Sequence, residues 1–272
     1  IWSRTVREVS LPGLGNVAPW QYAFILIGLA GLPVAVLMLT LREPARQLQQ
    51  NREELGKTSP RAAIRYARDN WKAYGFVLAA CIMTTVTYSQ NWLPAMYQRT
   101  WDWPPEKYAL WYGIALVVVG PTSVNFAGWL SDRIYASGKR DAPVTVICWG
   151  LLLTVPTGCI SPLMPTGELA FAVLVCNLIG LAMISAMAPV ALLNITPGQI
   201  RGQIVAIYYL VISITGLVLG PMTVGLLNDF VVGEQNARYS VALVPSICGL
   251  PVLFLLRWML NAYRMKVASL ED

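Results

Sequence analysis

The stretch GWLSDRIYASGKR, residues 128–140, connects two long apolar segments of the chain. The glycine that opens it would allow another helix to pack closely at this point. Asp132 follows one helical turn later, at the expected membrane interface, where a carboxylate favours the positive N-terminal end of a neighbouring helix. Arg133, Lys139 and Arg140 are expected to face the cytoplasm and anionic lipid. A GxxxDR pattern followed by GKR is much more specific than a lone GxxxD.

The composition around this stretch is that of an integral membrane protein. Of the 272 residues, 56% are hydrophobic and only 12% are charged, and the mean hydropathy is +0.54. A soluble domain carries about 25% charged residues, so too few charges are present here to cover that much apolar surface in water. The same arithmetic excludes a disordered chain and a disulfide scaffold.

The lack of histidine narrows the classes of function. Histidine is the commonest metal ligand and the commonest general base. We therefore expect no enzyme, no catalytic residues, no metal site and no cofactor. The 5 cysteines lie in apolar runs without a close CxxC pair, which is typical of buried, unreactive thiols.

The apolar residues form seven stretches, and each is long enough to cross a bilayer as a helix, which takes about 20 residues. The stretches are 21–41, 73–96, 108–131, 143–161, 168–192, 203–227 and 239–260. This pattern predicts an all-α polytopic membrane protein that is embedded in the lipid bilayer. Tryptophan and tyrosine gather near the ends of the stretches, as they do at membrane interfaces.

The basic residues predict how the chain is oriented in the membrane. Fifteen of the 20 Lys and Arg residues fall on one side of the seven stretches. The positive-inside rule assigns that side to the cytoplasm, so the N-terminus of this chain is expected outside and the C-terminus inside. This bias also explains the basic pI of about 9.1 without any nucleic-acid partner.

A long polar linker, residues 42–72, separates the first apolar stretch from the other six. Its second part, PRAAIRYARDNWKAY, places small and aromatic residues on one side of a helix and basic residues on the other. Two interpretations remain open, a short amphipathic helix on the inner leaflet and a solvated basic linker.

Three segments carry a resemblance to the major facilitator superfamily, and in particular to bacterial spinster-like members. The first is the 128–140 stretch, which resembles the conserved inter-helix loop G-x-L-x-D-R-x-G-R-R of that superfamily. The second, APWQYAFILIGLAGLPVAVLMLTLREP at 18–44, resembles the sixth helix running into the central loop. The third, NITPGQIRGQIVAIYYLVISITGLVLGP at 194–221, resembles the tenth-to-eleventh loop and the eleventh helix.

The resemblance implies a domain organisation that explains the one-plus-six division. Residues 1–41 would be an outer loop and the last helix of an N-terminal half, and 42–72 the cytoplasmic linker between halves. Residues 73–262 would form the C-terminal six-helix bundle, and 263–272 a cytoplasmic tail. The chain is thus expected to be a C-terminal fragment, helices six to twelve, that lacks transport activity without its N-terminal half.

The resemblance implies secondary active transport by alternating access, and symport as its type. The expected location is the cell membrane, which in bacteria is the inner membrane. The substrate would be a small organic or amphipathic solute, for which spinster-like relatives suggest lysolipid-like compounds. Polar residues inside the apolar stretches are the candidates for the substrate cavity, because buried amides in lipid must bond across helices or line water. These candidates are Tyr88, Gln90, Asn91, Asn125, Asn177, Tyr208 and Tyr209. For the first five of them, structural bonding between helices is the alternative.

A second set of residues is expected to act as a conformational latch on the cytoplasmic side. The resemblance implies that Asp132 approaches the fifth helix, and that the segment from Gly198 to Gly202 meets the first-half copy of the motif. The latch candidates are Gly128, Asp132, Arg133, Gly138, Lys139, Arg140 and Arg201. Gly216, Gly220 and Pro221 are candidates for a hinge, with close helix packing through GxxxG as the alternative.

A complete seven-helix receptor or sensor is the competing function, since the topology fits both. The last apolar stretch has no lysine for a retinal Schiff base, and the long linker and the GxxxDR stretch favour the transporter. No charged residue falls in the middle of any stretch. If transport is coupled to protons, we expect the titrating group to lie in the N-terminal half.

Overall fold

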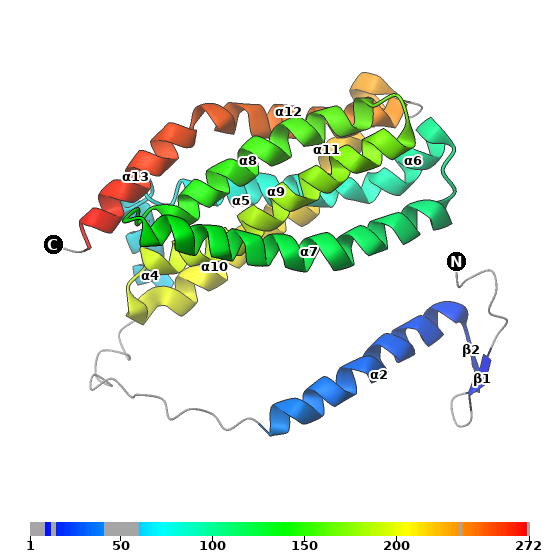
Figure 1. Cartoon of the computed structure of the whole chain (residues 1–272), viewed down its shortest axis with the longest axis horizontal. Helices are drawn as coiled ribbons and strands as arrows, with labels where there is room; N and C mark the ends of the chain where they lie inside the picture. The colour runs from blue at the N-terminus through cyan, green and yellow to red at the C-terminus, as the bar shows by residue number, and fades with distance from the viewer. Residues whose placement is uncertain (1–8, 12–14, 41–59, 234–235, 271–272) are drawn as a thin grey trace. The chain divides into compact units, whose positions relative to one another are not determined.

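The structure is a computed structural model that describes residues 9–11, 15–40, 60–233 and 236–270. The chain divides into two compact units, residues 1–56 and residues 57–272. We call the first unit the N-terminal segment and the second unit the bundle (Figure 1).

The N-terminal segment contains a small hairpin and one apolar helix. Strands β1 (Val9–Leu11) and β2 (Gly15–Val17) pair antiparallel, with Val9 opposite Val17. The sequence predicted only a loop here, and the two three-residue strands are the one departure from an all-α fold among the described residues. Helix α2 (Pro19–Leu39) follows, within two residues of the predicted stretch 21–41.

The bundle consists of helices that run mostly along one common direction (Figure 1). The α-helices are α4 (Pro60–Asp69), α5 (Phe76–Ser89), α6 (Leu93–Trp101), α7 (Pro105–Ala136), α8 (Ala142–Ile160), α9 (Gly167–Asn194), α10 (Arg201–Ile214), α11 (Gly220–Leu227), α12 (Ala237–Phe254) and α13 (Leu256–Ala268). Short 3₁₀ turns η1 (Gln90–Trp92), η2 (Ser161–Leu163) and η3 (Gly198–Ile200) and π-helical turns η4 (Thr215–Leu219) and η5 (Asn228–Val232) join them.

Five helical segments of the described chain are long and apolar enough to cross a membrane. They are 105–136, 142–163, 167–194, 198–232 and 237–254. The predicted stretch 73–96 forms a broken helix instead, because α5 ends at Ser89 and continues through η1 into α6. A polytopic helical membrane protein is therefore confirmed, with elements at all seven predicted positions.

Helix α7 is longer than the predicted stretch 108–131, and this corrects the sequence analysis. The helix continues to Ala136, so Asp132 and Arg133 lie in its last turns and not in a loop. The connection to α8 is a tight turn at Gly138, whose φ of +88° is the left-handed conformation that suits glycine. The N–H groups of Gly138 and Lys139 donate to the carbonyls of Tyr135 and Ile134, at 2.9 and 3.4 Å. This pair of bonds is the Schellman arrangement that ends helices.

Residues 60–69 of the linker form α4, which favours the helical alternative over a solvated chain there. The helix attaches to the bundle through its small and aromatic side, since Ala63 is fully buried. The Tyr66 hydroxyl donates to the carbonyl of Ile195 at 3.0 Å, just beyond the end of α9. Its arginines at 61, 65 and 68 are exposed. Linker residues 42–59 lie outside the described residues.

Helices α8 and α9 form the centre of the bundle, and two glycines bring their backbones together. A Cβ on Gly150 would lie 2.9 Å from the carbonyl oxygen of Gly180, and a Cβ on Gly180 would lie 2.7 Å from that of Gly150. Close approach through small residues is how helices associate in membranes, where lipid removes the hydrophobic driving force. Half of the most apolar window in each of these helices is buried.

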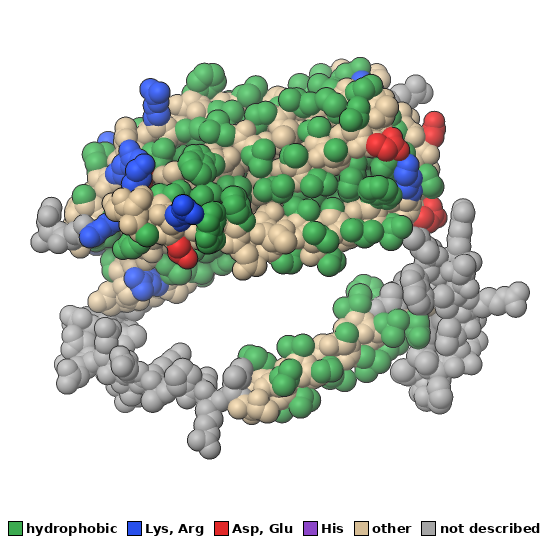
Figure 2. Space-filling view, in the orientation of Figure 1, with side chains coloured by type: hydrophobic (Ala, Val, Ile, Leu, Met, Phe, Trp, Pro, Cys, Tyr) green, Lys and Arg blue, Asp and Glu red, His purple; other side chains and the backbone are tan. Residues whose placement is uncertain are grey.

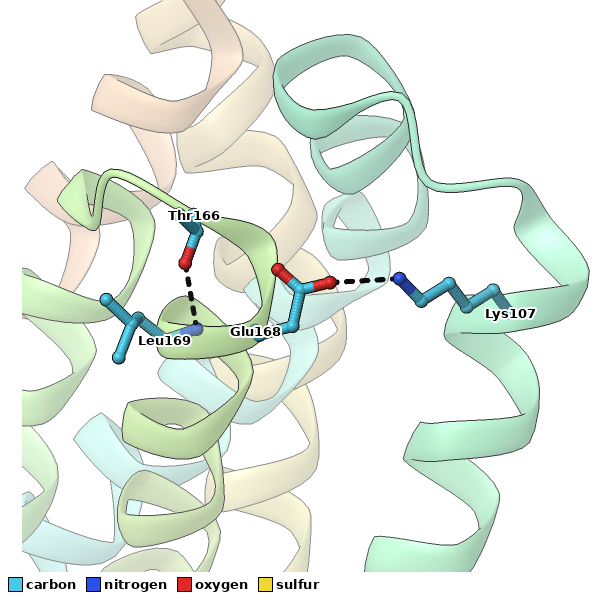
Figure 3. A network of polar contacts seen from close by, with 4 residues as sticks. All are labelled: Lys107, Thr166, Glu168 and Leu169. Carbon is cyan, nitrogen blue, oxygen red and sulfur yellow. Dashed lines mark hydrogen bonds and ion pairs between the residues drawn. The ribbon is translucent and has the colours of Figure 1, made fainter.

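Aromatic side chains and an exposed ion pair connect α6 with the first turns of α7 and α9 at one end of the bundle. Tyr97 packs between Trp101, Trp103 and Tyr108, with ring centroids 4.9–5.2 Å apart. Lys107 of α7 lies 3.8 Å above the Trp103 ring and 3.0 Å from Glu168 of α9 (Figure 3). Figure 3 also shows the start of α9, where Thr166 accepts a hydrogen bond from the N–H of Leu169, as N-cap threonines do.

Charged side chains are unevenly distributed between the two ends of the bundle. On the face shown in Figure 2, Lys and Arg gather at the end that carries α4 and α13, while Asp and Glu gather mainly at the α6 end. Between them the surface is largely hydrophobic, as expected of a surface in contact with lipid.

Candidate functional site

A proline breaks the helix at the point where the leading cavity candidate lies. Pro94 has no N–H to donate to the carbonyl of Gln90, which an α-helix would require. The N–H of Leu93 donates to that carbonyl instead, and Gln90–Trp92 become the 3₁₀ turn η1. The turn directs the Gln90 side chain into the bundle, where it is 8% exposed.

Gln90 forms the centre of a polar network that joins four helical elements. Its Nε2 donates to Asn177 Oδ1 of α9 at 2.9 Å, and its Oε1 accepts from the Tyr112 hydroxyl of α7 at 3.2 Å. The Nδ2 of Asn177 donates in turn to the carbonyl of Thr154 in α8 at 2.8 Å. Gly158 leaves room for this contact, since a Cβ there would lie 3.1 Å from Asn177 Nδ2. Buried amides are stable in such a place only when bonded in this way.

Two hollows adjoin Gln90. A cavity of about 20 Å³ lies on one side, against Asn177, Ser161 and Pro245, and has room for about one water molecule. An open hollow of about 210 Å³ lies on the other side, between α5, α7 and α9. We call it the Gln90 hollow, and its lining residues are Met83, Thr87, Gln90, Tyr112, Ala115, Leu116, Val119, Gly120, Leu178, Leu181, Ala182 and Ser185.

The Gln90 hollow has the lining of a site for an uncharged or amphipathic molecule. Apolar side chains make most of the wall, and Thr87, Gln90, Tyr112 and Ser185 supply the polar groups. A few convergent polar groups in an apolar wall are typical of ligand pockets, although such pockets usually enclose about 300–1,000 Å³. At about 210 Å³, the hollow is smaller than a typical ligand pocket.

The structure brings together two of the seven predicted cavity residues, Gln90 and Asn177. Asn177 is 1% exposed and bonded on both sides, so it joins helices, and it borders the small cavity. The other five lie away from the Gln90 hollow. Asn91 is exposed, and Asn125 is exposed with its Nδ2 donating to the carbonyl of Pro121 in its own helix at 2.8 Å.

The three predicted tyrosines lie toward α10 and α11. Tyr88 packs on the glycines of that element, because a Cβ on Gly216 would lie 2.6 Å from its ring and one on Gly220 2.7 Å from its Cβ. Tyr208 is buried and Tyr209 is half exposed, with their rings edge to face at 5.1 Å.

Sequence reasoning missed three polar residues of the hollow, Thr87, Tyr112 and Ser185. Thr87 precedes Gln90 by three positions, so helical spacing could have placed both on one face. Ser185 follows Asn177 by eight positions, about two turns, and the same argument applies. Tyr112 gave no such signal, because its contact with Gln90 depends on how α7 packs against α5.

The predicted latch residues lie at the α13 end of the bundle. Asp132 is exposed and Arg133 lies over the Trp129 ring at 5.4 Å, while Arg201 Nε donates to the carbonyl of Thr196 at 3.0 Å. Gly128 makes no close helix contact within the described chain, and its predicted role in helix packing stays a prediction. A Cβ on Gly128 would meet no atom within 4 Å, because this side of α7 faces away from the bundle.

The predicted hinge residues form a close packing surface. Gly216 lies in the π-helical turn η4, and both it and Gly220 leave no room for a Cβ against α5. The carbonyl of Pro221 accepts from Trp92 Nε1 at 3.3 Å. This geometry favours the GxxxG alternative, although π-helical turns are also frequent at functional positions.

The fold and the site define the class of protein as a polytopic α-helical membrane protein with a mostly apolar hollow between its helices. A sequence model described as the Major Facilitator Superfamily matches residues 10–221. The chain therefore belongs to the Major Facilitator Superfamily.

Two solved structures of a bacterial protein share the fold. A bacterial homologue of the human lysosomal transporter Spinster, inward-facing and unoccupied, is 20% identical, with a TM-score of 0.58 over 94% of this chain. The occupied, inward-facing form is 21% identical, with a TM-score of 0.50 over 96% of this chain. The chain spans 61% and 56% of the lengths of these two structures. No curated protein matches the sequence.

Proposed function

We propose that the protein is a secondary active transporter of a small organic or amphipathic solute, working by alternating access. The observation that carries this proposal is the Gln90 hollow, a mostly apolar space with convergent polar groups inside a superfamily transporter fold. None of the residues that line the hollow is charged. An uncharged or amphipathic solute therefore fits it better than a multiply charged one. Superfamily membership favours this function over the seven-helix receptor.

A second, N-terminal half is proposed to complete the transport path. Helices α7 and α10–α11 are the least buried of the membrane-length segments, with 17% and 22% of their most apolar windows buried. Asp132 lies on the first of these elements and Arg201 on the second. These are the elements that the resemblance assigns to contacts with the other half, so the latch role of both residues is part of the proposal.

The proposed setting is the cell membrane, with the α4 and α13 end on the cytoplasmic side. The gathering of Lys and Arg at that end supports this orientation. Symport is proposed with the coupling group outside the Gln90 hollow, because its lining offers no carboxylate.

Uptake into proteoliposomes tests the proposed function. The protein, expressed from its complete reading frame, would be offered labelled lysophosphatidylcholine and labelled glucose, each with and without a pH gradient. We expect gradient-dependent accumulation of the amphipathic probe. Tyr112→Phe removes the hydroxyl group that donates a hydrogen bond to Gln90 Oε1. This variant should raise the KM for the amphipathic probe several-fold.

Thr122→Ala is the matched control for Tyr112→Phe. Thr122 lies on the same helix, is exposed, and bonds only to carbonyls of its own helix. Its uptake kinetics should equal those of the unmodified protein. Failure to accumulate either probe under any gradient would count against the transport function, and an unchanged KM in Tyr112→Phe would assign that residue to packing.

A further inference from the structure

The hydrogen bonds behind the Gln90 hollow fix the direction in which two amide side chains point. Asn177 Nδ2 donates to the backbone carbonyl of Thr154 at 2.8 Å, and a carbonyl can only accept. The amide nitrogen of Asn177 therefore faces Thr154, and its oxygen accepts from Gln90 Nε2 at 2.9 Å. Gln90 Oε1 is thereby directed toward Tyr112, which lines the hollow. Asn177 is thus a positioning residue, because it transmits the fixed direction of a backbone group to Gln90.

Three oxygen atoms in the lining of the hollow can accept a hydrogen bond from a ligand but have no hydrogen left to donate. The Tyr112 hydroxyl donates its single hydrogen to Gln90 Oε1 at 3.2 Å. Thr87 Oγ1 donates its single hydrogen to the carbonyl of Met83, in its own helix, at 2.8 Å. The oxygens of Tyr112, Thr87 and the Gln90 amide each keep at least one lone pair. Thr87 is also exposed, so a ligand in the hollow can reach its oxygen.

The same lining offers fewer donors than acceptors to a ligand. Its side-chain donors are the second N–H of the Gln90 amide and the hydroxyl of Ser185, and none of the described lining residues is a lysine or an arginine. A carboxylate brings only acceptors and a negative charge, so its oxygens would face the oxygens of the lining. A hydroxyl or an amino group brings hydrogens, which the three acceptor oxygens can bind.

We propose that the Gln90 hollow selects solutes in which a hydrogen-bond donor, a hydroxyl or an amine, is joined to an apolar tail. This inference rests on the proposed transport function and names the chemistry of its substrate. The oxygens of the lining accept from the donor group, and the apolar wall, which includes Leu116, Leu178 and Leu181, contacts the start of the tail. Lysophosphatidylcholine carries one such donor, its glycerol hydroxyl.

Equilibrium binding in nanodiscs tests this selectivity without requiring transport. The protein, expressed from its complete reading frame, would be titrated with two labelled neutral probes. One is the monodecyl ether of glycerol, which has free hydroxyls, and the other is its dimethyl ether, which keeps the oxygens and has no O–H. Thr87→Val removes the acceptor oxygen and preserves the shape of the side chain. This variant should bind the hydroxyl probe about three- to tenfold more weakly and the dimethyl ether with unchanged affinity.

Thr122→Val is the matched control, because Thr122 is also exposed and bonds to carbonyls of its own helix but does not line the hollow. It should bind both probes as the unmodified protein does. Asn177→Leu tests the positioning role: the Gln90 amide can then turn, so the preference for the hydroxyl probe over the dimethyl ether should decrease. A purely structural role of Asn177 would leave that preference unchanged. Thr87→Val decides the test if circular dichroism shows that Asn177→Leu does not fold.

The outcomes separate this inference from the proposed transport function. Equal affinities of Thr87→Val and Thr122→Val for the hydroxyl probe overturn the donor selectivity of the hollow. If lysophosphatidylcholine is still accumulated in proteoliposomes, that result leaves the transport function in place. Binding that depends on the hydroxyls and on Thr87, without uptake of any probe, supports the selectivity and counts against transport.

Discussion

Gln90 is the residue on which the candidate site depends, because both of its polar atoms are used inside the bundle. The amide nitrogen bonds Asn177 and the amide oxygen accepts from Tyr112. The same side chain borders the small cavity and the open hollow. A ligand that enters the hollow therefore meets an amide whose orientation is already fixed, which lowers the entropic cost of binding.

Gln90→Leu should destabilise the bundle by roughly 1–3 kcal/mol, since it leaves the buried amide oxygen of Asn177 without its donor. The measurement is thermal or denaturant unfolding in detergent, monitored by the circular dichroism signal of the helices. Asn91→Leu is the control: Asn91 is the next residue and is exposed, and the change should stay within about 0.5 kcal/mol. Equal losses in the two variants would mean that the buried network contributes no measurable stability.

At the scale of elements, the turn η4 and the helix α11 pack on α5 through the two glycines Gly216 and Gly220. The turn η4 is π-helical and joins α10 to α11, so this turn of the helix contains one more residue than an α-helical turn. The packing partner is Tyr88, whose ring and Cβ occupy the space where glycine Cβ atoms would be. The sequence pattern GxxxG predicted close packing correctly, and only the structure identified α5 as the partner.

Gly216→Ala should lower the stability of the bundle by about 1–3 kcal/mol, because the added methyl group overlaps the Tyr88 ring and Thr84. Gly225→Ala is the matched control in α11, where a Cβ would meet nothing within 4 Å. That change should be neutral or slightly stabilising. Tyr88→Ala combined with Gly216→Ala should recover part of the loss, and strict additivity of the two changes would contradict a direct contact.

At the scale of the whole molecule, the contact between Asp141 and Arg264 fixes the last helix to the rest of the bundle. The two residues are 123 positions apart, and Asp141 is buried while the Arg264 side chain is 52% exposed. Removal of Arg264 and removal of Asp141 should therefore lower the free energy of unfolding by different amounts. A buried charge without a partner is much more costly than an exposed one.

Arg264→Ala should therefore destabilise the fold by about 3 kcal/mol, as removal of one partner of a buried ion pair does, and Asp141→Ala should cost less. Unfolding temperatures of the two variants in nanodiscs, compared at low and high salt, give the measurement. The loss in Arg264→Ala should depend little on salt, since the carboxylate is shielded from solvent. The reverse order of the two losses would show that Asp141 is not held as a buried carboxylate.

The sequence by itself determined the class of fold, the positions of the helices and the presence of the superfamily signature. These follow from local quantities, because the bilayer requires long apolar helices whatever their partners are. The sequence also indicated Gln90, since an amide in an apolar stretch must be bonded or line a polar space. It placed the end of α7 five residues too early, because the helix continues beyond the apolar residues until the left-handed turn at Gly138.

Only the tertiary structure decided which polar residues meet. Tyr112 and Asn177 are 22 and 87 positions from Gln90, and no local pattern relates residues at such distances. The pairing of Asp141 with Arg264 depends in the same way on how the helices pack. Local sequence fixes which face of a helix is polar, but the choice of its neighbour is made by close approach at glycines such as Gly150 and Gly180.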